Sequence, residues 1–414
     1  MSSNAQPSLF TCTQQSPDSH FNSSTKSKAR LGCIRTPHGE IQTPAFIFCA
    51  TNGAIKAVTA EDMRVERTQI ILSNTFHLMS FASHIKKLGG LAHMSGWGGP
   101  TLTDSGGYQI FSMGYGSVAE EIKCNRKFPG KRPNVKISED GVVFKSCISG
   151  ESLFLSPERS IEIQEEIGAD LIVAFDECTP YNVDRTYTEH SMRRSHRWEK
   201  RSLVRFNELE AQKPEYALPQ AMYGIVQGGV YEDLRKESCD FVNNELFFGQ
   251  AIGGSLGAST EQMREVIGIT MQQLRADRPT HLLGIGRISD IFDGVEIGID
   301  TFDCVHPTRL ARHGGALVKG GDPHAKGDAR EHINLKNSVY VGDEHPIEQD
   351  CLCQTCQKYS RGYIHHLIKK REILAHLLIA RHNVRFMNDL MADVREGIAT
   401  ATLPQVKNKW LGSK

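Results

Sequence analysis

Eight short apolar runs, each five to seven residues long, alternate with longer amphipathic stretches along most of the chain. Most of these stretches predict helices, and two of them begin with serine as an N-cap, at Ser156-Pro157-Glu158 and Ser259-Thr260-Glu261. Such alternation indicates a parallel sheet. Eight strands predict a closed (β/α)8 barrel of the TIM type, and a doubly wound sheet with two extra strands is the alternative. The runs are Pro44–Cys49, Gln69–Asn74, Pro100–Asp104, Asp170–Asp176, Ala221–Gln227, Phe248–Gly254, His281–Gly286 and Thr301–Val305.

Several of these predicted strands end in a polar side chain that could take part in chemistry. In a closed barrel the carboxyl ends of all strands share one rim, so such side chains converge although they lie far apart in the sequence. An average strand end is also polar because it enters a loop, so the pattern defines candidates only. They are Asn74, Asp104, Asp176, Gln227 and Asp303.

The last run presents the most informative of these side chains. The stretch Gly298–Arg309 is a short apolar strand that delivers Asp303 and then turns away through Pro307, Thr308 and Arg309. Strand-end carboxylates are a usual source of catalytic groups in parallel barrels. A carboxylate that only caps the following loop is the alternative.

The composition restricts the class of protein. Hydrophobic residues make up 39% of the 414 and charged residues 23%, which is the mix of a globular chain with a large core. The formal net charge is zero, so a nucleic-acid partner would need a local basic patch. No apolar run approaches the roughly 20 residues of a membrane helix, and no secretory signal is predicted. The 11 cysteines, an odd number, fit thiols or metal ligation in a reducing cytoplasm.

The chain divides into four predicted segments. Residues 1–30 are polar and form a loose lead-in, residues 31–340 form the barrel, residues 341–400 form a cysteine-containing subdomain and the last barrel helix, and residues 401–414 form a tail. An insertion at 117–150, which could be a hairpin, interrupts the barrel after its third strand. It is a solvated basic loop or a flap that contacts phosphates. Its basic residues are Lys123, Arg126, Lys127, Lys131, Arg132 and Lys136.

Three cysteines within six residues predict a metal site. Cys351, Cys353 and Cys356 could reach one zinc ion, which takes four tetrahedral ligands from cysteine and histidine. A long amphipathic helix predicted from about Gly362 could supply the fourth ligand. The candidates on it are His365, His366, His376 and His382. Four protein ligands would make the site structural, and three reduced buried thiols are the alternative.

Together these features resemble the tRNA-guanine transglycosylase family, from about residue 28 to residue 400. The resemblance rests on six motifs in the expected order. They are Asn74-Thr75-Phe76-His77-Leu78, Thr103-Asp104-Ser105-Gly106-Gly107-Tyr108-Gln109, Phe175-Asp176-Glu177-Cys178-Thr179-Pro180-Tyr181, Gly224-Ile225-Val226-Gln227-Gly228, Phe302-Asp303-Cys304-Val305-His306-Pro307-Thr308-Arg309 and the Cys351-x-Cys353-x-x-Cys356 cluster.

The resemblance implies a TIM-barrel enzyme with an inserted zinc subdomain, usually a homodimer. Such an enzyme replaces the wobble guanine of tRNAs with GUN anticodons by a free 7-deazaguanine, queuine or its aminomethyl precursor preQ1. Asp303 would be the nucleophile and Asp104 the general acid/base. The base would be bound by Asp104, Ser105, Gly106, Gly107, Tyr108, Asp176, Gln227 and Gly254.

The resemblance also implies which residues bind RNA and zinc. The zinc ligands would be Cys351, Cys353, Cys356 and His382, the histidine being chosen because the family places it before Asn-aliphatic-Arg. The tRNA would lie along Gly284, Ile285, Gly286, Arg287, Ile288, Ser289, Asp290, Thr308, Arg309, Leu310, Ala311 and Arg312. Basic residues beside the zinc cluster are either a solvated face or a track for the RNA backbone; they are Lys369, Lys370, Arg371, Arg381 and Arg385.

One loop departs from the family pattern. After Gly253-Gly254, bacterial members continue with Leu-Ala-Val-Gly, whereas this chain has Ser255-Leu256-Gly257-Ala258 and is apparently one residue shorter. A smaller loop would leave room for the bulkier queuine, although Cys178 is the bacterial form. The main alternative function is a non-catalytic RNA-binding partner subunit of the same fold. An archaeal relative that modifies another tRNA position, and a zinc hydrolase, fit the sequence less well.

Overall fold

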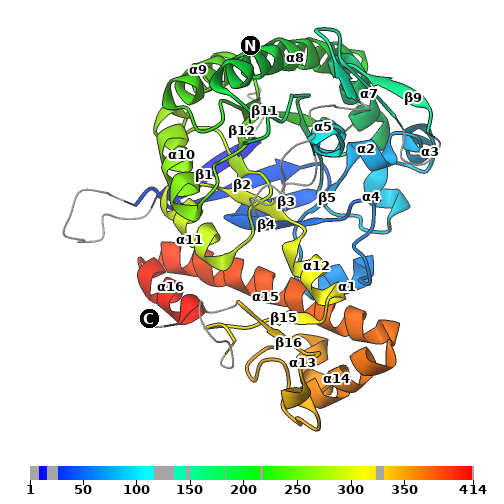
Figure 1. Cartoon of the computed structure of the whole chain (residues 1–414), viewed down its shortest axis with the longest axis vertical. Helices are drawn as coiled ribbons and strands as arrows, with labels where there is room; N and C mark the ends of the chain where they lie inside the picture. Colours follow the sequence, from blue (N-terminus) through cyan, green and yellow to red (C-terminus); the bar gives the residue numbers. More distant parts are fainter. Residues whose placement is uncertain are drawn as a thin grey trace, which may run out of the picture.

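The computed structural model describes residues 9–15, 27–115, 135–145, 150–181, 183–214, 218–322 and 331–412. Eight parallel strands close into a barrel in the order β10-β11-β12-β13-β14-β4-β5-β6 (Figure 1). The predicted (β/α)8 barrel is therefore confirmed, and the doubly wound sheet is excluded because β10 also pairs with β6. The strands are β4 Ala45–Cys49, β5 Ile71–Ser73, β6 Thr101–Thr103, β10 Leu171–Val173, β11 Ala221–Val226, β12 Gly249–Ile252, β13 Thr280–Leu282 and β14 Thr301–Cys304.

Helices form the outer layer around these strands (Figure 1). The two predicted serine caps are confirmed: Ser156 accepts from the amide of Arg159, and Ser259 from that of Gln262. These caps fix where the helices begin. The described helices as far as the one that follows β14 are α1 Ala60–Val65, α2 Thr75–Leu78, α3 Ala82–Lys87, α4 Leu91–Met94, α5 Gly107–Tyr115, α7 Pro157–Ile167, α8 Arg185–Gln212, α9 Glu232–Asn244, α10 Thr260–Gln273, α11 Ile288–Glu296 and α12 His306–Arg312.

A small antiparallel sheet of β1 Phe10–Gln15, β2 Arg30–Thr36 and β3 Gly39–Thr43 precedes the barrel. The expectation that all of residues 1–30 are loose is therefore wrong for β1, which pairs with β2. Phe10 explains the difference, because its side chain is buried in a cluster with Ile34 and Ile41. The pair Leu9 and Phe10 in a polar segment is too weak a signal to predict a strand.

The insertion after the third barrel strand contains more than a hairpin. Its described part and the residues that follow form an antiparallel sheet of β7 Val135–Ile137, β8 Val142–Lys145 and β9 Ser152–Leu155. The turn between β7 and β8 rests on α8, where the Trp198 indole donates to the carbonyl of Glu139 at 2.8 Å. Of the six basic residues, Lys136 lies exposed in β7, and the other five lie outside the described residues.

The C-terminal region lies below the barrel in Figure 1. The predicted single long helix from Gly362 is wrong, because Arg371 adopts a left-handed conformation, with φ 61°, and ends α14 before α15 begins. The predicted C-terminal tail instead contains α16, whose Trp410 is 1% exposed and packs on Phe386. The elements are β15 Gly315–Leu317, β16 His332–Asn334, the 3-10 turn Ser338–Tyr340, α13 Gln354–Lys358, α14 Arg361–Lys370, α15 Ile373–Ala399 and α16 Leu403–Leu411.

Helix α15 joins the C-terminal region to the barrel. Its Val384, Phe386 and Leu390 belong to the same buried cluster as barrel residues, among them Phe302 of β14. Next to them, Asn383 donates to the carbonyls of Pro307 in α12 and Gly315 in β15, and accepts from the amide of Leu317. The helix therefore holds the segment that follows β14.

Candidate active site and metal centre

The predicted site residues meet at the carboxyl end of the barrel. Asp104 directly follows β6, Gln227 directly follows β11, and Asp303 lies within β14. Asn74, which caps α2 after β5, donates its side-chain amide to Asp104. The Gln227 amide donates to Asp176 Oδ2 at 2.5 Å, so the structure brings the five predicted strand-end residues together in two hydrogen-bonded pairs and Asp303.

In the described part of the chain, Asp104 accepts hydrogen bonds from neutral groups only. Oδ1 accepts from the amides of Thr75 (2.9 Å) and Gly106 (3.1 Å), and Oδ2 accepts from the side chains of Asn74 and Gln109. Burial is nevertheless the stronger influence and raises the pKa of Asp104 to about 7, with a smaller contribution from the charge on Asp303. A carboxyl group with this pKa can give or take a proton near neutral pH.

Asp176 and Gln227 form a second polar pair in the mouth. Burial raises the pKa of Asp176 to about 7, although Gln227 and Ser105 donate to its carboxylate. The Gln227 carbonyl oxygen has no hydrogen-bond partner among the described residues and is fully buried. A carboxylate beside a free amide oxygen offers acceptors that match the N–H groups of a flat heterocycle.

Two glycines leave space for these side chains. Gly254 has φ +72°, and a Cβ there would lie 2.3 Å from the Gln227 amide oxygen. A Cβ at Gly107 would lie 2.7 Å from the carbonyl of Asp176. Any other residue would therefore displace a base-binding candidate. Tyr108 is 44% exposed in the first turn of α5, so it is not a core residue.

Side chains of helices α8 and α9 form hydrogen bonds with the carboxyl ends of β10 and β11. These contacts were not predicted from the sequence. Their buried serines accept the backbone amides that β-pairing leaves open beside Asp176 and Gln227. Ser202 accepts from Phe175 (3.2 Å), Ser195 from Glu177 (3.0 Å) and Ser238 from Gln227 (2.9 Å). Glu199, one turn after Ser195, accepts from Ile225 at 2.8 Å. The available signal was a stripe of polar residues at helical spacing on α8.

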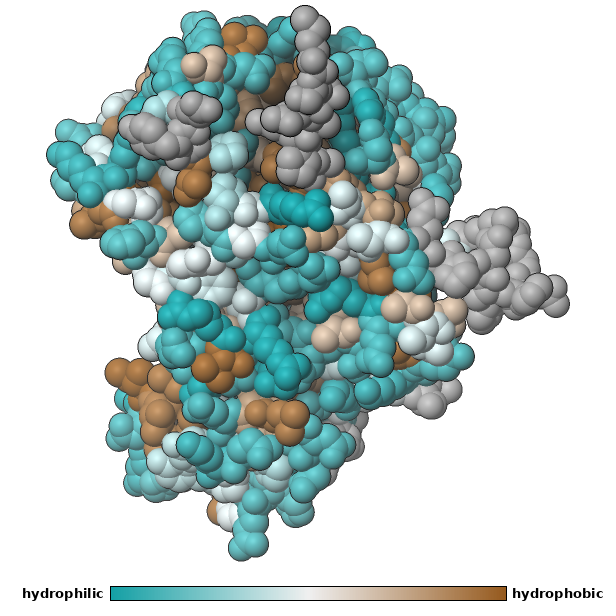
Figure 2. All heavy atoms as spheres, turned by 180° about the vertical axis from the view of Figure 1, so that it is seen from behind, coloured by the Kyte–Doolittle hydropathy of each residue, from teal (hydrophilic) through white to brown (hydrophobic). Residues whose placement is uncertain are grey.

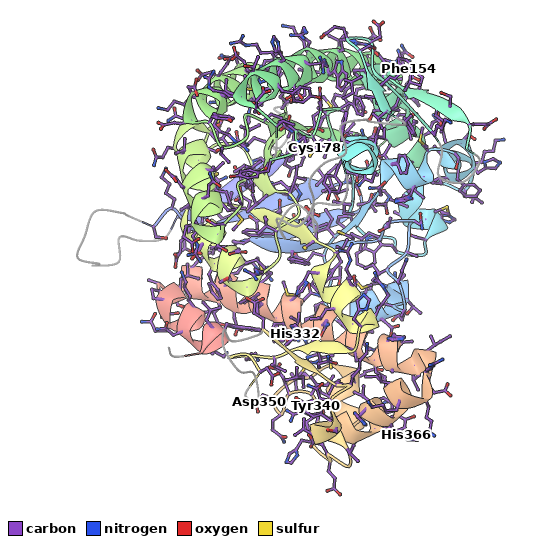
Figure 3. The ribbon with its side chains drawn as sticks, in the orientation of Figure 1. Phe154, Cys178, His332, Tyr340, Asp350 and His366 are labelled. Carbon is purple, nitrogen blue, oxygen red and sulfur yellow. The ribbon has the colours of Figure 1, made fainter. Side chains whose placement is uncertain are left out.

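Asp303 is held differently on its two oxygens. Oδ1 accepts from the amide of Gly284 at 2.9 Å and lies 3.2 Å from His281 Nε2. Oδ2 lies 3.6 Å from the thiol of Cys49. Neither His281 nor Cys49 was among the candidates, because both were assigned to apolar runs and read as part of a strand. Figure 3 shows Cys178 within the ring of barrel helices, whereas His332, Tyr340 and His366 lie in the C-terminal region.

The residues predicted to lie along RNA differ in exposure. The side chains of Arg287 and Arg309 are exposed beside the mouth, and Arg312 is half-buried. Those of Ile288, Asp290, Thr308 and Ala311 are buried, so they could act only by holding their neighbours.

The three cysteines and His382 form one buried cluster. Their ligand atoms lie within 4.8 Å of one another, and His382 Nδ1 lies 3.6, 3.8 and 3.3 Å from the sulfurs of Cys351, Cys353 and Cys356. A tetrahedral zinc at its usual bond lengths would place sulfur and nitrogen about 3.5 Å apart. The other ring nitrogen contacts the carbonyl of Leu317 at 2.8 Å, which aims Nδ1 at the thiols. The cluster therefore fits a metal ion.

The alternative histidines are engaged or distant. His365 Nδ1 contacts the carbonyl of Leu335 at 2.9 Å, and His376 Nδ1 that of Ala311 at 3.4 Å. His366 is exposed on α14. Among the described residues, the group Cys351, Cys353, Cys356 and His382 is the only one with this ligand geometry.

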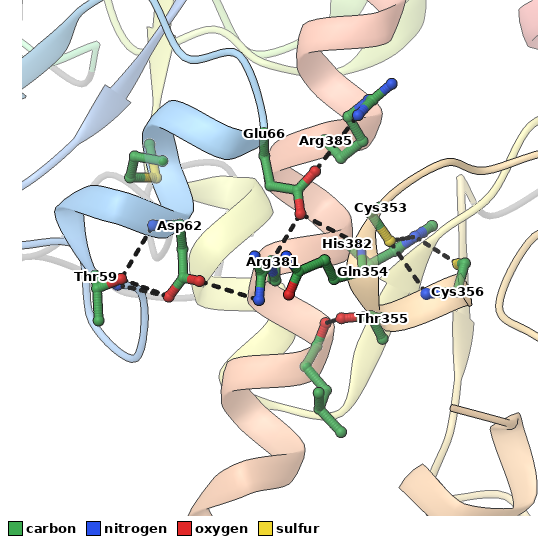
Figure 4. Close-up of polar contacts among 12 residues, drawn as sticks. Thr59, Asp62, Glu66, Cys353, Gln354, Thr355, Cys356, Arg381, His382 and Arg385 are labelled. Carbon is green, nitrogen blue, oxygen red and sulfur yellow. Dashed lines mark hydrogen bonds and ion pairs between the residues drawn. The ribbon is translucent and has the colours of Figure 1, made fainter. Parts of the chain in front are cut away.

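Charged side chains beside the cluster tie α15 to α1 (Figure 4). Arg381 contacts Glu66 at 2.8 Å and Asp62 at 3.1 Å, and Arg385 contacts Glu66 at 3.6 Å. Glu66 is 1% exposed. A track for the RNA backbone is therefore wrong for Arg381 and Arg385, because protein carboxylates already occupy their guanidinium groups. Lys369, Lys370 and Arg371 are exposed.

No helix in the described part of the chain is both long and apolar enough to cross a membrane.

Comparison with known proteins identifies the chain. Residues 24–414 match the family model described as queuine tRNA-ribosyltransferase. The protein named queuine tRNA-ribosyltransferase from Roseiflexus sp. (strain RS-1) is 44% identical to this chain, over 93% of this chain and 96% of its own length. The protein of the same name from Chlamydia trachomatis serovar L2 is 43% identical, over 91% of this chain and 97% of its own length. One from Natranaerobius thermophilus is 41% identical, over 91% and 93%. The chain therefore belongs to the queuine tRNA-ribosyltransferase family.

Proposed function

We propose that this protein exchanges the wobble guanine of tRNAs with GUN anticodons for a free 7-deazaguanine, through a covalent ribosyl ester of Asp303. One observation carries the proposal: two carboxyl groups, the buried Asp303 and the half-buried Asp104, share the barrel mouth, and burial of its carboxyl group raises the pKa of Asp104 to about 7. A nucleophile and a proton carrier are the two groups that such an exchange needs.

In the first half of the reaction, Asp303 bonds to C1′ of the ribose while the C1′–N9 bond breaks. The bonding electrons leave with guanine, and the proton that neutralises it comes from Asp104. In the second half, Asp104 takes the N9 proton of the incoming base, whose nitrogen attacks C1′ and expels Asp303. Each half exchanges one C1′ bond for another, so no external energy source is needed.

Asp176, Gln227 and the turn from Ser105 to Tyr108 bind the base in this proposal. Asp176 accepts from the exocyclic amine and ring N–H of guanine, and Tyr108 lies exposed where a ring could stack. The base must leave the anticodon stack to reach this pocket, so the RNA backbone has to be held. Arg287, Arg309 and Arg312, beside the mouth, supply that positive charge.

The cluster of Cys351, Cys353, Cys356 and His382 would hold one structural zinc ion. Four protein ligands leave no open position for chemistry, so the ion would supply folding stability only.

Queuine is the incoming base that the loop after Gly254 favours. Gly257 has φ +111°, and a Cβ there would lie 2.6 Å from Gln262, so the loop carries no side chain at this point. The smaller loop leaves more room beside the 7-substituent of the base. Guanine release from tRNA measured with queuine and with preQ1 tests this; turnover with preQ1 and none with queuine would contradict it.

A homodimer is part of the proposal. Val339, Val341 and Ile373, in the C-terminal region, are 53, 67 and 78% exposed, and Figure 2 shows apolar side chains gathered over the lower part of the molecule. Exposed apolar surface of this kind is commonly covered by a partner. Light scattering measures the mass in solution, and a monomer at all concentrations would contradict the dimer.

Exchange of radiolabelled guanine into tRNA, with denaturant trapping of an RNA–protein adduct, tests the central proposal. The wild type should give both signals and Asp303→Ala neither. A wild type that binds tRNA with neither exchange nor adduct would instead support the non-catalytic partner subunit.

A further inference from the structure

His281 lies directly beneath the proposed nucleophile. It belongs to β13, next to β14, and its side chain points into the barrel, where it is 1% exposed. Nε2 lies 3.2 Å from Asp303 Oδ1, yet the contact lacks the angle of a hydrogen bond, and Nε2 has no aligned acceptor among the described residues. A buried ring nitrogen without a partner is uncommon in a folded protein.

The contacts of the ring decide which nitrogen carries the proton. An unprotonated Nε2 would direct its lone pair at a carboxylate oxygen 3.2 Å away, which is repulsive, so Nε2 carries the hydrogen. Nδ1 then accepts from the hydroxyl of Thr301, 2.9 Å away. The edge of the ring rests near Tyr223, with the two ring centres 6.2 Å apart. Thr301 and Tyr223 together hold the ring in place, with Nε2 3.2 Å from Asp303 Oδ1.

The two oxygens of Asp303 consequently have different roles. Oδ1 accepts a hydrogen bond from the amide of Gly284 and lies 3.2 Å from His281 Nε2. Among the described residues, Oδ2 has only the thiol of Cys49 at 3.6 Å, and a thiol is a weak donor. The less engaged oxygen is the better nucleophile, so Oδ2 bonds to the ribose and Oδ1 becomes the carbonyl oxygen of the ester.

We propose that His281 is a positioning residue that keeps the ribosyl ester of Asp303 reversible, which rests on the function proposed above. The polar N–H of a ring nitrogen 3.2 Å from Oδ1 stabilises the full charge of a carboxylate more than the partial charge of an ester carbonyl. His281 therefore lowers the amount of covalent adduct. It also helps Asp303 to leave when the incoming base attacks.

The test compares the ratio of covalent adduct to free enzyme at steady state, with an anticodon stem-loop RNA, guanine as the incoming base and a denaturant quench. His281→Phe removes the donor and should raise the ratio about tenfold, which corresponds to about 1.4 kcal/mol, while it slows release of the adduct. His281→Gln keeps an N–H near the position of Nε2 and should stay within about threefold of the wild type.

Two further variants serve as controls. Tyr223→Phe touches the same ring but offers no donor to Asp303, so its ratio should equal that of the wild type. Thr301→Val leaves the imidazole but frees its orientation, and should give an intermediate ratio. If a thermal melt shows that His281→Phe does not fold, the comparison of Thr301→Val with His281→Gln and the wild type provides the test instead.

The outcomes separate this inference from the proposed function. A wild type that forms no adduct overturns the ribosyl-ester mechanism itself. A wild type that forms the adduct, with His281→Phe and Thr301→Val giving the wild-type ratio, overturns the role of His281 alone. An equal rise in Tyr223→Phe would show that packing beneath the ring controls the ratio, and that result also overturns it.

Discussion

The barrel mouth and the cysteine–histidine cluster both bury charged groups, but they treat them in opposite ways. In the mouth, Asp104 and Asp176 have neutral donors and, in the described part of the chain, no ion pair with lysine or arginine, so their pKa values rise. Beside the cluster, the buried Glu66 faces two guanidinium groups. A buried carboxylate without an ion-pair partner lowers the stability of the fold and is typical of a functional site. A buried carboxylate that is paired with arginine instead holds two helices together.

The largest effect should come from a metal ligand. Cys353→Ser leaves three ligands and should release the ion, and zinc binding in small folded modules is worth about 10 kcal/mol or more at neutral pH. We expect loss of metal by elemental analysis and a large fall in melting temperature. Cys239→Ser is the matched control, because Cys239 is a buried thiol outside the cluster. An unchanged melt in metal-free Cys353→Ser would show that the two regions do not differ in this way.

The next effect should appear in activity alone. Asp303→Ala removes the proposed nucleophile and should lower guanine exchange on the order of 10⁴-fold. Because Asp303 contributes no Lys or Arg ion pair in the described structure, the melting temperature should change little. A large fall in melting temperature together with the loss of activity would contradict the view that the carboxylates of the barrel mouth do not stabilise the fold.

The pH dependence of stability should distinguish the two regions. Burial raises the pKa of Asp104 from 3.8 to about 7, so the folded state holds a proton that the unfolded chain has lost between those values. Stability should therefore fall as pH rises through this window, by up to about 1.4 kcal/mol for each pH unit, and level off outside it. Asp104→Asn should be less pH-dependent than the wild type in denaturant titrations from pH 4 to 8. If the unfolding free energies of Asp104→Asn and the wild type changed equally with pH, the raised pKa of Asp104 would be disproved.

The smallest effect should come from the ion pairs between α1 and α15. Glu66→Gln removes one buried charge, but Arg381 keeps Asp62 and Arg385 keeps Asp389. Breaking a buried pair costs about 3–5 kcal/mol when a charge is left alone, and we expect about 2–3 kcal/mol here because both arginines retain a partner. Exposed Glu61→Gln, five residues earlier, is the control. Equal unfolding free energies for Glu66→Gln and Glu61→Gln would show that the ion pairs of Glu66 do not stabilise the contact between α1 and α15.

Local sequence patterns predicted what local forces determine. All eight barrel strands overlap predicted apolar runs, and two helix starts coincide with serine caps, because hydrophobic periodicity and capping act over a few residues. The cysteine spacing predicted a metal cluster, yet it left four histidines open, since the fourth ligand lies 26 residues beyond Cys356. Only the resemblance selected His382.

Features that depend on tertiary contacts escaped prediction. The break at Arg371 has no glycine or proline to mark it, and α16 is stabilised by the burial of Trp410, which lies in a polar segment. His281 and Cys49 read as strand interior, and only the register of β13, β14 and β4 places them around Asp303. The roles of Asp104, Asp176, Gln227 and Asp303 stay predictions that the proposed experiments test.

Helix α15 carries the metal-cluster histidine and, at the very next position, the asparagine that grips the chain just past the strand of Asp303. A single helix therefore contacts both the cysteine–histidine cluster and the segment that follows β14. In the proposed function, an ion held by the cluster would therefore influence the alignment of Asp303 without taking part in bond-making, and a chelator would inhibit guanine exchange from a distance.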